Sequence, residues 1–156
     1  MQDRIDRNAF YALQPELPKA LIRLGQLGVE AGLEKTLVEL VKIRASQLNG
    51  CAFCLHMHLA DARKYGEDQE RLDVLAAWKE VPCFSERERA ALTWTEALTQ
   101  VAEDGVSDDV FSQVRAQFND AELAGLTSAI VAINGWNRIA VGFQFSPDVK
   151  QLQAAE

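Results

Sequence analysis

The chain has 156 residues, of which 48% are hydrophobic and 25% charged, and its formal net charge is −7. A chain of this length can bury roughly two-thirds of its unfolded surface in one domain without disulfides. No apolar run approaches the ~20 residues of a membrane span, and the acidic balance disfavours nucleic acid, which is bound by clustered Lys and Arg. Residues 1–7 lack the basic start and apolar run of a secretory signal, so we expect a cytoplasmic protein without a membrane partner.

Apolar residues recur every three or four positions along most of the chain, which is typical of helices that bury one face. No stretch alternates at period two for long enough to indicate a strand. Helices are expected over residues 18–32, 34–48, 51–65, 68–78, 86–101, 107–118 and 120–136, the last reaching 145 in its longest form. We therefore predict a single all-α domain of six to eight helices that spans residues 1–156.

Local signals at helix ends support these boundaries. Asn49-Gly50 is a turn dipeptide that breaks one helix just before Cys51. Ser85 followed by Glu88 is a capping box, which satisfies two backbone N–H groups at a helix start. The break at Asn49-Gly50 predicts that Cys51 stands at the N-terminus of its helix.

Residues 51–58 place two thiols and two imidazoles close together. If a helix starts at Cys51, an advance of about 100° per residue puts Cys54 at about 300° and His58 at about 340°. The three groups then share a sector of about 60°, whereas His56 falls near about 140° and is expected on the surface or in an interface. The buried stripe of this helix is expected to contain Cys51, Cys54, Leu55, His58, Ala62 and Tyr65.

This arrangement predicts thiol chemistry, because a chain without a secretory signal does not use three cysteines as a disulfide framework. The helix N-terminus stabilises the Cys51 thiolate. His58, one turn after Cys54, can take the proton of that thiol directly or through water. Sulfurs on neighbouring turns can also close a disulfide, so that one thiolate attacks and the other resolves.

Two other interpretations of the cysteine pair stay open from the residues alone. The thiols can be buried apolar side chains without a reaction. They can also bind zinc with His58, and Glu39 would then be the fourth ligand. Structural zinc usually takes a second Cys or His pair, and here only Cys83 and His56 remain.

The spacing Glu39, eleven residues, Cys51, two residues, Cys54, three residues and His58 resembles that of the AhpD-like alkylhydroperoxidases. These proteins belong to the carboxymuconolactone decarboxylase superfamily. The stretches 42–50, 57–62, 84–88 and 134–138 are also similar, so the resemblance covers most of the chain. It implies an all-helical fold assembled into trimers or hexamers, and the reduction of organic hydroperoxides through the Cys pair.

The resemblance also implies a role for each site residue. Cys54 attacks the peroxide oxygen, Cys51 resolves the sulfenate as a disulfide, and His58 with Glu39 relays the proton. The helix dipole alone favours Cys51 as the attacking thiol, but it contributes only about 0.3 to 1 kcal/mol and a base beside Cys54 can outweigh it. The implied electron donor is a dithiol, either a dihydrolipoamide-bearing or a thioredoxin-like protein, and neither a cofactor nor a bound metal is expected.

Two positions depart from the pattern of this family. One is His56, where related short members often have an acidic residue, and the other is Phe53. The better-known alkylhydroperoxidases carry a further His where this chain has Phe53, so part of their proton relay is missing. On its own helix, Glu39 stands three or four residues from Lys35 and Lys42, which is typical of a solvated face. The resemblance instead predicts a buried carboxylate that is hydrogen-bonded to His58.

The third cysteine and three aromatic residues are expected to take no part in the reaction. Cys83 follows Pro82 in a loop without a nearby base and is expected to take no part in the reaction. Trp94, Trp136 and Tyr65 have core spacing and are expected in packing or subunit contacts. Two alternative functions stay open, namely a lactone decarboxylase on the same fold and a non-enzymatic redox sensor or zinc-binding protein.

Overall fold

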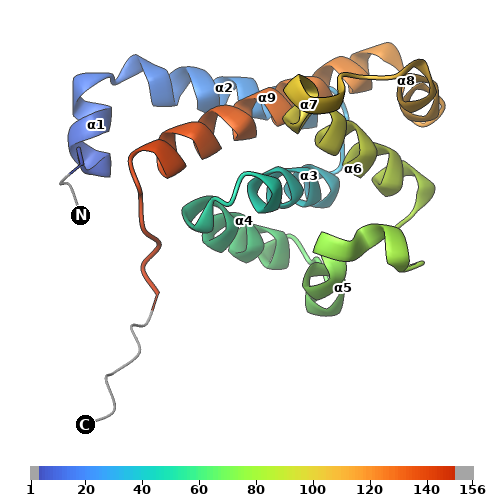
Figure 1. Cartoon of the computed structure of the whole chain (residues 1–156), viewed down its shortest axis with the longest axis horizontal. Coiled ribbons are helices and arrows are strands. Elements are labelled where there is room, and N and C mark those ends of the chain that lie inside the picture. The colour runs from blue at the N-terminus through green and yellow to red at the C-terminus, as the bar shows by residue number, and fades with distance from the viewer. Residues whose placement is uncertain (1–3, 150–156) are drawn as a thin grey trace, which may run out of the picture.

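The computed structural model describes residues 4–149, and within that range it contains helices and no strand (Figure 1). The prediction of an all-α fold is therefore confirmed. The helices are α1 (Arg7–Leu13), α2 (Glu16–Glu30), α3 (Lys35–Leu48), α4 (Ala52–Lys64), α5 (Gln69–Val74), the 3-10 helix η1 (Leu75–Glu80), α6 (Glu86–Thr99), α7 (Val101–Asp104), α8 (Asp108–Arg115) and α9 (Asp120–Gly142).

The described part of the chain has nine α-helices, which exceeds the expected six to eight. The additional elements are short, because α1 has seven residues and α7 has four, too few for a clear apolar period. Helix α1 begins at an N-cap, Asp6, whose carboxylate accepts hydrogen bonds from the backbone N–H groups of Asn8 and Ala9. Residues 68–78, expected as one helix, divide into α5 and η1.

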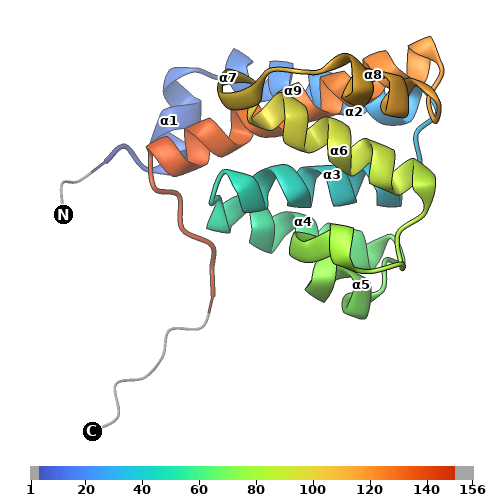
Figure 2. The ribbon, with the colours of Figure 1, turned by 45° about the vertical axis from the view of Figure 1, so that its right-hand side comes forward.

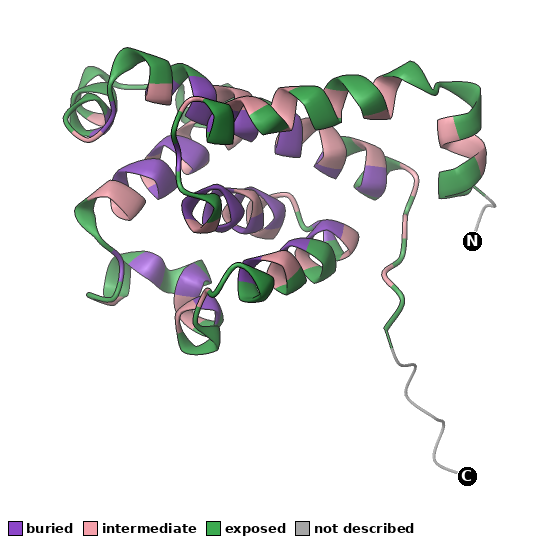
Figure 3. Cartoon of the chain, turned by 180° about the vertical axis from the view of Figure 1, so that it is seen from behind, coloured by how far each residue is buried: buried purple, intermediate pink, exposed green. Residues whose placement is uncertain are grey.

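The helices are arranged in layers around α3 (Figure 2). Helices α2 and α9 run side by side, α3 packs against α9 and α6, and α4 packs on the opposite side of α3. Figure 3 shows that burial concentrates on the surfaces that these layers turn toward one another. Helix α3 is thus covered from several directions, and this placement determines the environment of the candidate site.

Burial on α3 is broader than one helical stripe. Helical spacing alone puts Leu37, Leu40, Val41, Arg44 and Leu48 on one stripe, and the structure leaves Arg44 and Leu48 of this stripe only partly buried. The structure buries Leu37, Val38, Glu39, Leu40, Val41, Ile43, Ala45 and Ser46. The expected stripe is wrong in its width, because the packing of α3 against α4, α6 and α9 covers two faces of the helix.

Helices α2 and α9 approach each other closely where both carry glycine. A Cβ added at Gly125 would lie 2.6 Å from the Cβ of Ala31 and 3.1 Å from the backbone oxygen of Leu27. Since real carbon atoms do not come this close, only glycine fits without a shift of the helices. Although α9 has 23 residues, no helix within residues 4–149 combines the length and apolar character needed to span a membrane.

The predicted helix ends are present. The Ser85 side chain accepts from the Glu88 backbone N–H, and the Glu88 carboxylate accepts from the Ser85 N–H, which confirms the capping box. Helix α3 ends at Leu48 with Asn49 as its C-cap, and Gly50 adopts a positive φ of 65° that favours glycine. This turn sends the chain directly into Cys51.

Candidate functional site

The two cysteines stand at the N-terminus of α4. Cys51 is the N-cap residue of α4, and its Sγ accepts a hydrogen bond from the Cys54 backbone N–H at 3.3 Å. The two residues form a disulfide, with 5.4 Å between their Cα atoms. They are only 1% and 2% exposed and share an apolar cluster with Ala45, Ile133 and Ala140. The predicted pairing of sulfurs across one helical turn is therefore present.

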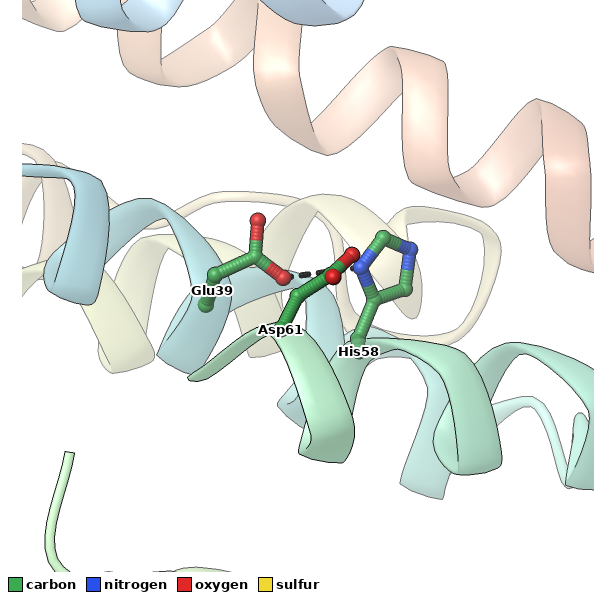
Figure 4. A group of neighbouring side chains, drawn as sticks. All are labelled: Glu39, His58 and Asp61. Carbon is green, nitrogen blue, oxygen red and sulfur yellow. Dashed lines mark hydrogen bonds and ion pairs between the residues drawn. The ribbon is translucent and has the colours of Figure 1, made fainter. Parts of the chain in front are cut away.

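His58 lies one turn beyond Cys54 on α4 and contacts Glu39 of α3 (Figure 4). The His58 Nδ1 atom lies 2.8 Å from Oε2 of Glu39, and the two side chains belong to residues that are 7% and 4% exposed. A carboxylate can only accept a hydrogen bond, so Nδ1 carries the proton. In the neutral ring Nε2 is then left with its lone pair, as a general base requires.

The Glu39 carboxylate is shared between two donors. Its Oε1 accepts from Lys42 Nζ at 2.7 Å, while Oε2 accepts from His58. Burial is the largest single influence and would raise the pKa of Glu39, but the hydrogen bonds and charges of His58 and Lys42 together outweigh it. The pKa of Glu39 is therefore lowered, and the carboxylate stays ionised near neutral pH.

Both expectations for Glu39 are met in part. The local pairing with Lys42 exists as predicted for a solvated face, yet Glu39 is buried and also bonded to His58. A helical pattern could not show this, because Glu39 is covered only after α4 packs against α3. The part of Glu39 in proton transfer stays a prediction.

Asp61 is a neighbour of this pair that the sequence interpretation missed. One ligand atom from each of Glu39, His58 and Asp61 lies within 4.8 Å of the others (Figure 4). The spacing of three residues between His58 and Asp61 could have revealed it, since i and i+3 share a helical face. Both Glu39 oxygens already accept hydrogen bonds, and the two sulfurs expected as zinc ligands are joined to each other in this form.

A cavity of about 470 Å³ lies beside His58. Its walls come from α1, α2, α3, α4 and α9, and they are mainly apolar. Phe53 and Trp136 line it and also pack on the apolar cluster that contains Cys54. The cavity therefore borders the imidazole directly, and two of its wall residues connect it to the cluster that contains Cys54. The contribution of α1 could not be predicted, because no helix was expected before Pro15.

A second hollow, of about 330 Å³, lies on the side of Cys51. It is lined by residues at the start of α4 and by the chain that follows α9, including Gln144 and Phe145. Cys51 lines this hollow, whereas His58 lines the other cavity. The two ends of the dithiol site thus border different openings.

Several other predictions can be compared with the structure. His56 and Cys83 are exposed, which agrees with their expected places outside the thiol site. Trp94 is buried and Trp136 is partly buried. Tyr65 was wrongly placed on the buried stripe, because it is the C-cap residue of α4 and is 43% exposed.

Asn137 is a fully buried polar residue of α9. Its amide Nδ2 donates to Ser46 Oγ at 3.0 Å, and its Oδ1 accepts from Asn49 Nδ2 at 2.9 Å. This network joins α9 to the end of α3, just before the cysteine pair. The sequence suggested an interface for Asn134, Trp136, Asn137 and Arg138, and it did not predict this hydrogen-bond network.

The fold and the geometry of the site define a class of protein, namely an all-helical protein with a cysteine pair next to a buried, hydrogen-bonded His–Glu pair. Residues 15–97 match the model of the carboxymuconolactone decarboxylase family. The protein is 38% identical to the uncharacterized protein YdfG of Bacillus subtilis (strain 168), over 86% of this chain and 92% of that protein. The chain belongs to the carboxymuconolactone decarboxylase family, as an AhpD-like member.

Solved structures support this assignment. A protein of unknown function from Agrobacterium tumefaciens, named as a candidate antioxidant defence protein AhpD, is 42% identical with a TM-score of 0.87, covering 96% of this chain and 100% of that one. The debrominase Bmp8 shares the fold, with a TM-score of 0.78 at 15% identity over 90% of this chain and 75% of its own.

Proposed function

We propose that this protein is a thiol-dependent peroxidase that reduces organic hydroperoxides through Cys54 and Cys51. The observation that carries the proposal is the disulfide at the start of α4, one turn from an imidazole whose Nδ1 is held by a buried carboxylate. A disulfide is the oxidised product of such a cycle. The apolar cavity beside His58 offers a place for the organic part of the peroxide.

The first step transfers an oxygen atom to sulfur. His58 Nε2 takes the proton of the Cys54 thiol, and the thiolate attacks the terminal oxygen of the hydroperoxide. The O–O bond breaks, the alkoxide takes the proton from His58, and an alcohol leaves. Cys54 is now a sulfenic acid and the peroxide has been reduced by two electrons. Glu39 keeps the imidazole in the tautomer that can accept a proton.

The second step closes the disulfide. The Cys51 thiolate attacks the Cys54 sulfur, an S–S bond forms, and the hydroxyl group leaves as water after protonation. An external dithiol then reduces the Cys51–Cys54 bond. We propose that this donor is a dihydrolipoamide-bearing or thioredoxin-like protein. We also propose that the peroxidase is cytoplasmic and forms a homo-oligomer, a trimer or hexamer. The hollow beside Cys51 supports an approach of the donor from that side.

Thiol counting tests this proposal. Reduced protein carrying Cys83→Ser, which leaves two thiols, should lose both when mixed with one equivalent of cumene hydroperoxide and should release one equivalent of alcohol. A Cys51→Ser protein should stop at a sulfenic acid on Cys54 that dimedone captures. A Cys54→Ser protein should yield no alcohol. If both thiols of the first protein survive the peroxide, it is not a peroxidase.

Two alternatives have separate signatures. A lactone decarboxylase would turn over carboxymuconolactone after Cys54→Ser, because it needs no redox cycle. A zinc-binding sensor would contain stoichiometric zinc as purified and would lose it on Cys51→Ala. Neither lactone decarboxylation nor zinc binding requires the Cys51–Cys54 disulfide, whereas a peroxidase cycle does.

A further inference from the structure

The cavity beside His58 has charges of one sign only. Its two charged lining residues other than the imidazole are Lys42 and Arg7, and none of its described lining residues is a carboxylate. Lys42 already donates to Glu39. Arg7 forms no hydrogen bond or ion pair among residues 4–149, and its guanidinium lies 5.2 Å from the centre of the Phe53 ring. Within residues 4–149, Arg7 is thus the lining cation of this cavity that has no side-chain hydrogen bond or ion pair.

The position of Arg7 is supported by packing. It is the first residue of α1, where Tyr11 stands edge-on to Trp136 with ring centres 6.1 Å apart. Phe10 of the same helix contacts Phe143 at 4.6 Å between ring centres. These contacts hold α1 against the end of α9, so the backbone of Arg7 is fixed at the edge of the cavity.

Phe53 connects this cation to the reaction site. It occupies the position between the cysteines, lines the cavity, and presents its ring to Arg7. A guanidinium over an aromatic face keeps its N–H groups available at the edges, where they can bind a carboxylate in a bidentate manner. A histidine at this position would place a polar ring where the cavity now has an apolar wall.

We propose that the cavity selects organic hydroperoxides that carry a carboxylate, with the acid bound by Arg7. The apolar chain of the ligand then lies among side chains such as Tyr11, Ile22 and Met57, and the peroxide end lies toward His58. A volume of about 470 Å³ is within the range of about 300 to 1,000 Å³ that small-molecule pockets occupy. The inference rests on the proposed peroxidase function and names the substrate class of that site.

A matched pair of substrates tests the inference. Linoleic acid hydroperoxide and its methyl ester, both below their micelle concentrations, differ only in the carboxylate that Arg7 would bind. We expect kcat/KM for the acid to exceed that for the ester by about fivefold, which is about 1 kcal/mol and the upper end for an exposed ion pair. The preference should decrease as salt is added, because the pair is exposed.

Three variants give the comparison its controls. Arg7→Gln should reduce the preference for the acid over the ester to about one. Arg7→Lys should retain most of the preference. Arg23→Gln removes the same charge from α2, where Arg23 pairs with Glu30 and does not line the cavity, and it should change nothing.

The outcomes separate the two proposals. If the wild type reduces cumene hydroperoxide but treats acid and ester alike, or if Arg7→Gln keeps the preference, the substrate assignment is wrong and the peroxidase function stands. If the wild type reduces none of the three peroxides and retains its thiols, the peroxidase function itself is wrong, and the substrate assignment is wrong with it.

Discussion

Replacing Glu39 by glutamine changes the proton relay without changing the shape of the site. The carboxylate accepts from both His58 Nδ1–H and Lys42 Nζ, whereas a glutamine has one acceptor oxygen and one donor amide. If the oxygen faces the ring, the amide N–H₂ meets the lysine ammonium. If the oxygen faces Lys42, the amide donates to Nδ1 and moves the ring proton to Nε2. We therefore expect Glu39→Gln to slow the oxidation of Cys54.

The magnitude follows from the hydrogen bond that is lost. A hydrogen bond to a charged group contributes about 1.5 to 3 kcal/mol, and Glu39 is 4% exposed, so little solvent weakens it. Each 1.36 kcal/mol of transition-state stabilisation is tenfold in rate. The rate constant for Cys54 oxidation should thus decrease by roughly 10- to 100-fold.

Stopped-flow measurement of thiol loss under excess cumene hydroperoxide determines this rate constant. Glu96→Gln is the matched control, because Glu96 also accepts from a lysine, Lys79 at 2.7 Å, but lies on α6 and does not contact His58. It should reduce stability and leave the oxidation rate unchanged. An oxidation rate for Glu39→Gln within twofold of the wild type would refute the assigned relay.

Three further predictions concern stability. Because the pKa of Glu39 is lowered on folding, the ionised carboxylate contributes to the free energy of unfolding fully above the ordinary pKa of about 4.3, and this contribution is lost as pH falls through the folded pKa. Urea titrations should therefore show that the difference in free energy of unfolding between wild type and Glu39→Gln decreases in acid. A difference that stays constant with pH would contradict this linkage. Gly125→Ala should destabilise by about 1 to 3 kcal/mol because its Cβ would meet α2, whereas Gly142→Ala, which meets nothing within 4 Å, should not; equal melting temperatures would count against the close packing. Asn137→Ala should cost about 1 to 3 kcal/mol in chemical denaturation, since it removes the donor to buried Ser46 Oγ and one acceptor of Asn49 Nδ2, and a neutral effect would show that the network contributes no stability.

Most of the helical order was predictable because it depends on neighbours along the chain. The capping box at Ser85 and Glu88 and the break at Gly50 need only a few adjacent residues. The common face of Cys51, Cys54 and His58 follows from helical geometry alone. Helix α1 could not be predicted in this way, because its stability comes from aromatic contacts with Phe143 and Phe145, far along the chain.

The sequence by itself therefore determined the spacing of the thiol pair and of His58 one turn further on, since spacing on one helix settles these relations. Only the tertiary structure decided the environment of Glu39, because a carboxylate three residues from a lysine is solvated until another helix covers it. The packing of α4 on α3 buries Glu39 and brings it to His58. The same long-range packing places Arg7 of α1 at the cavity, a relation that no local pattern along the chain contains.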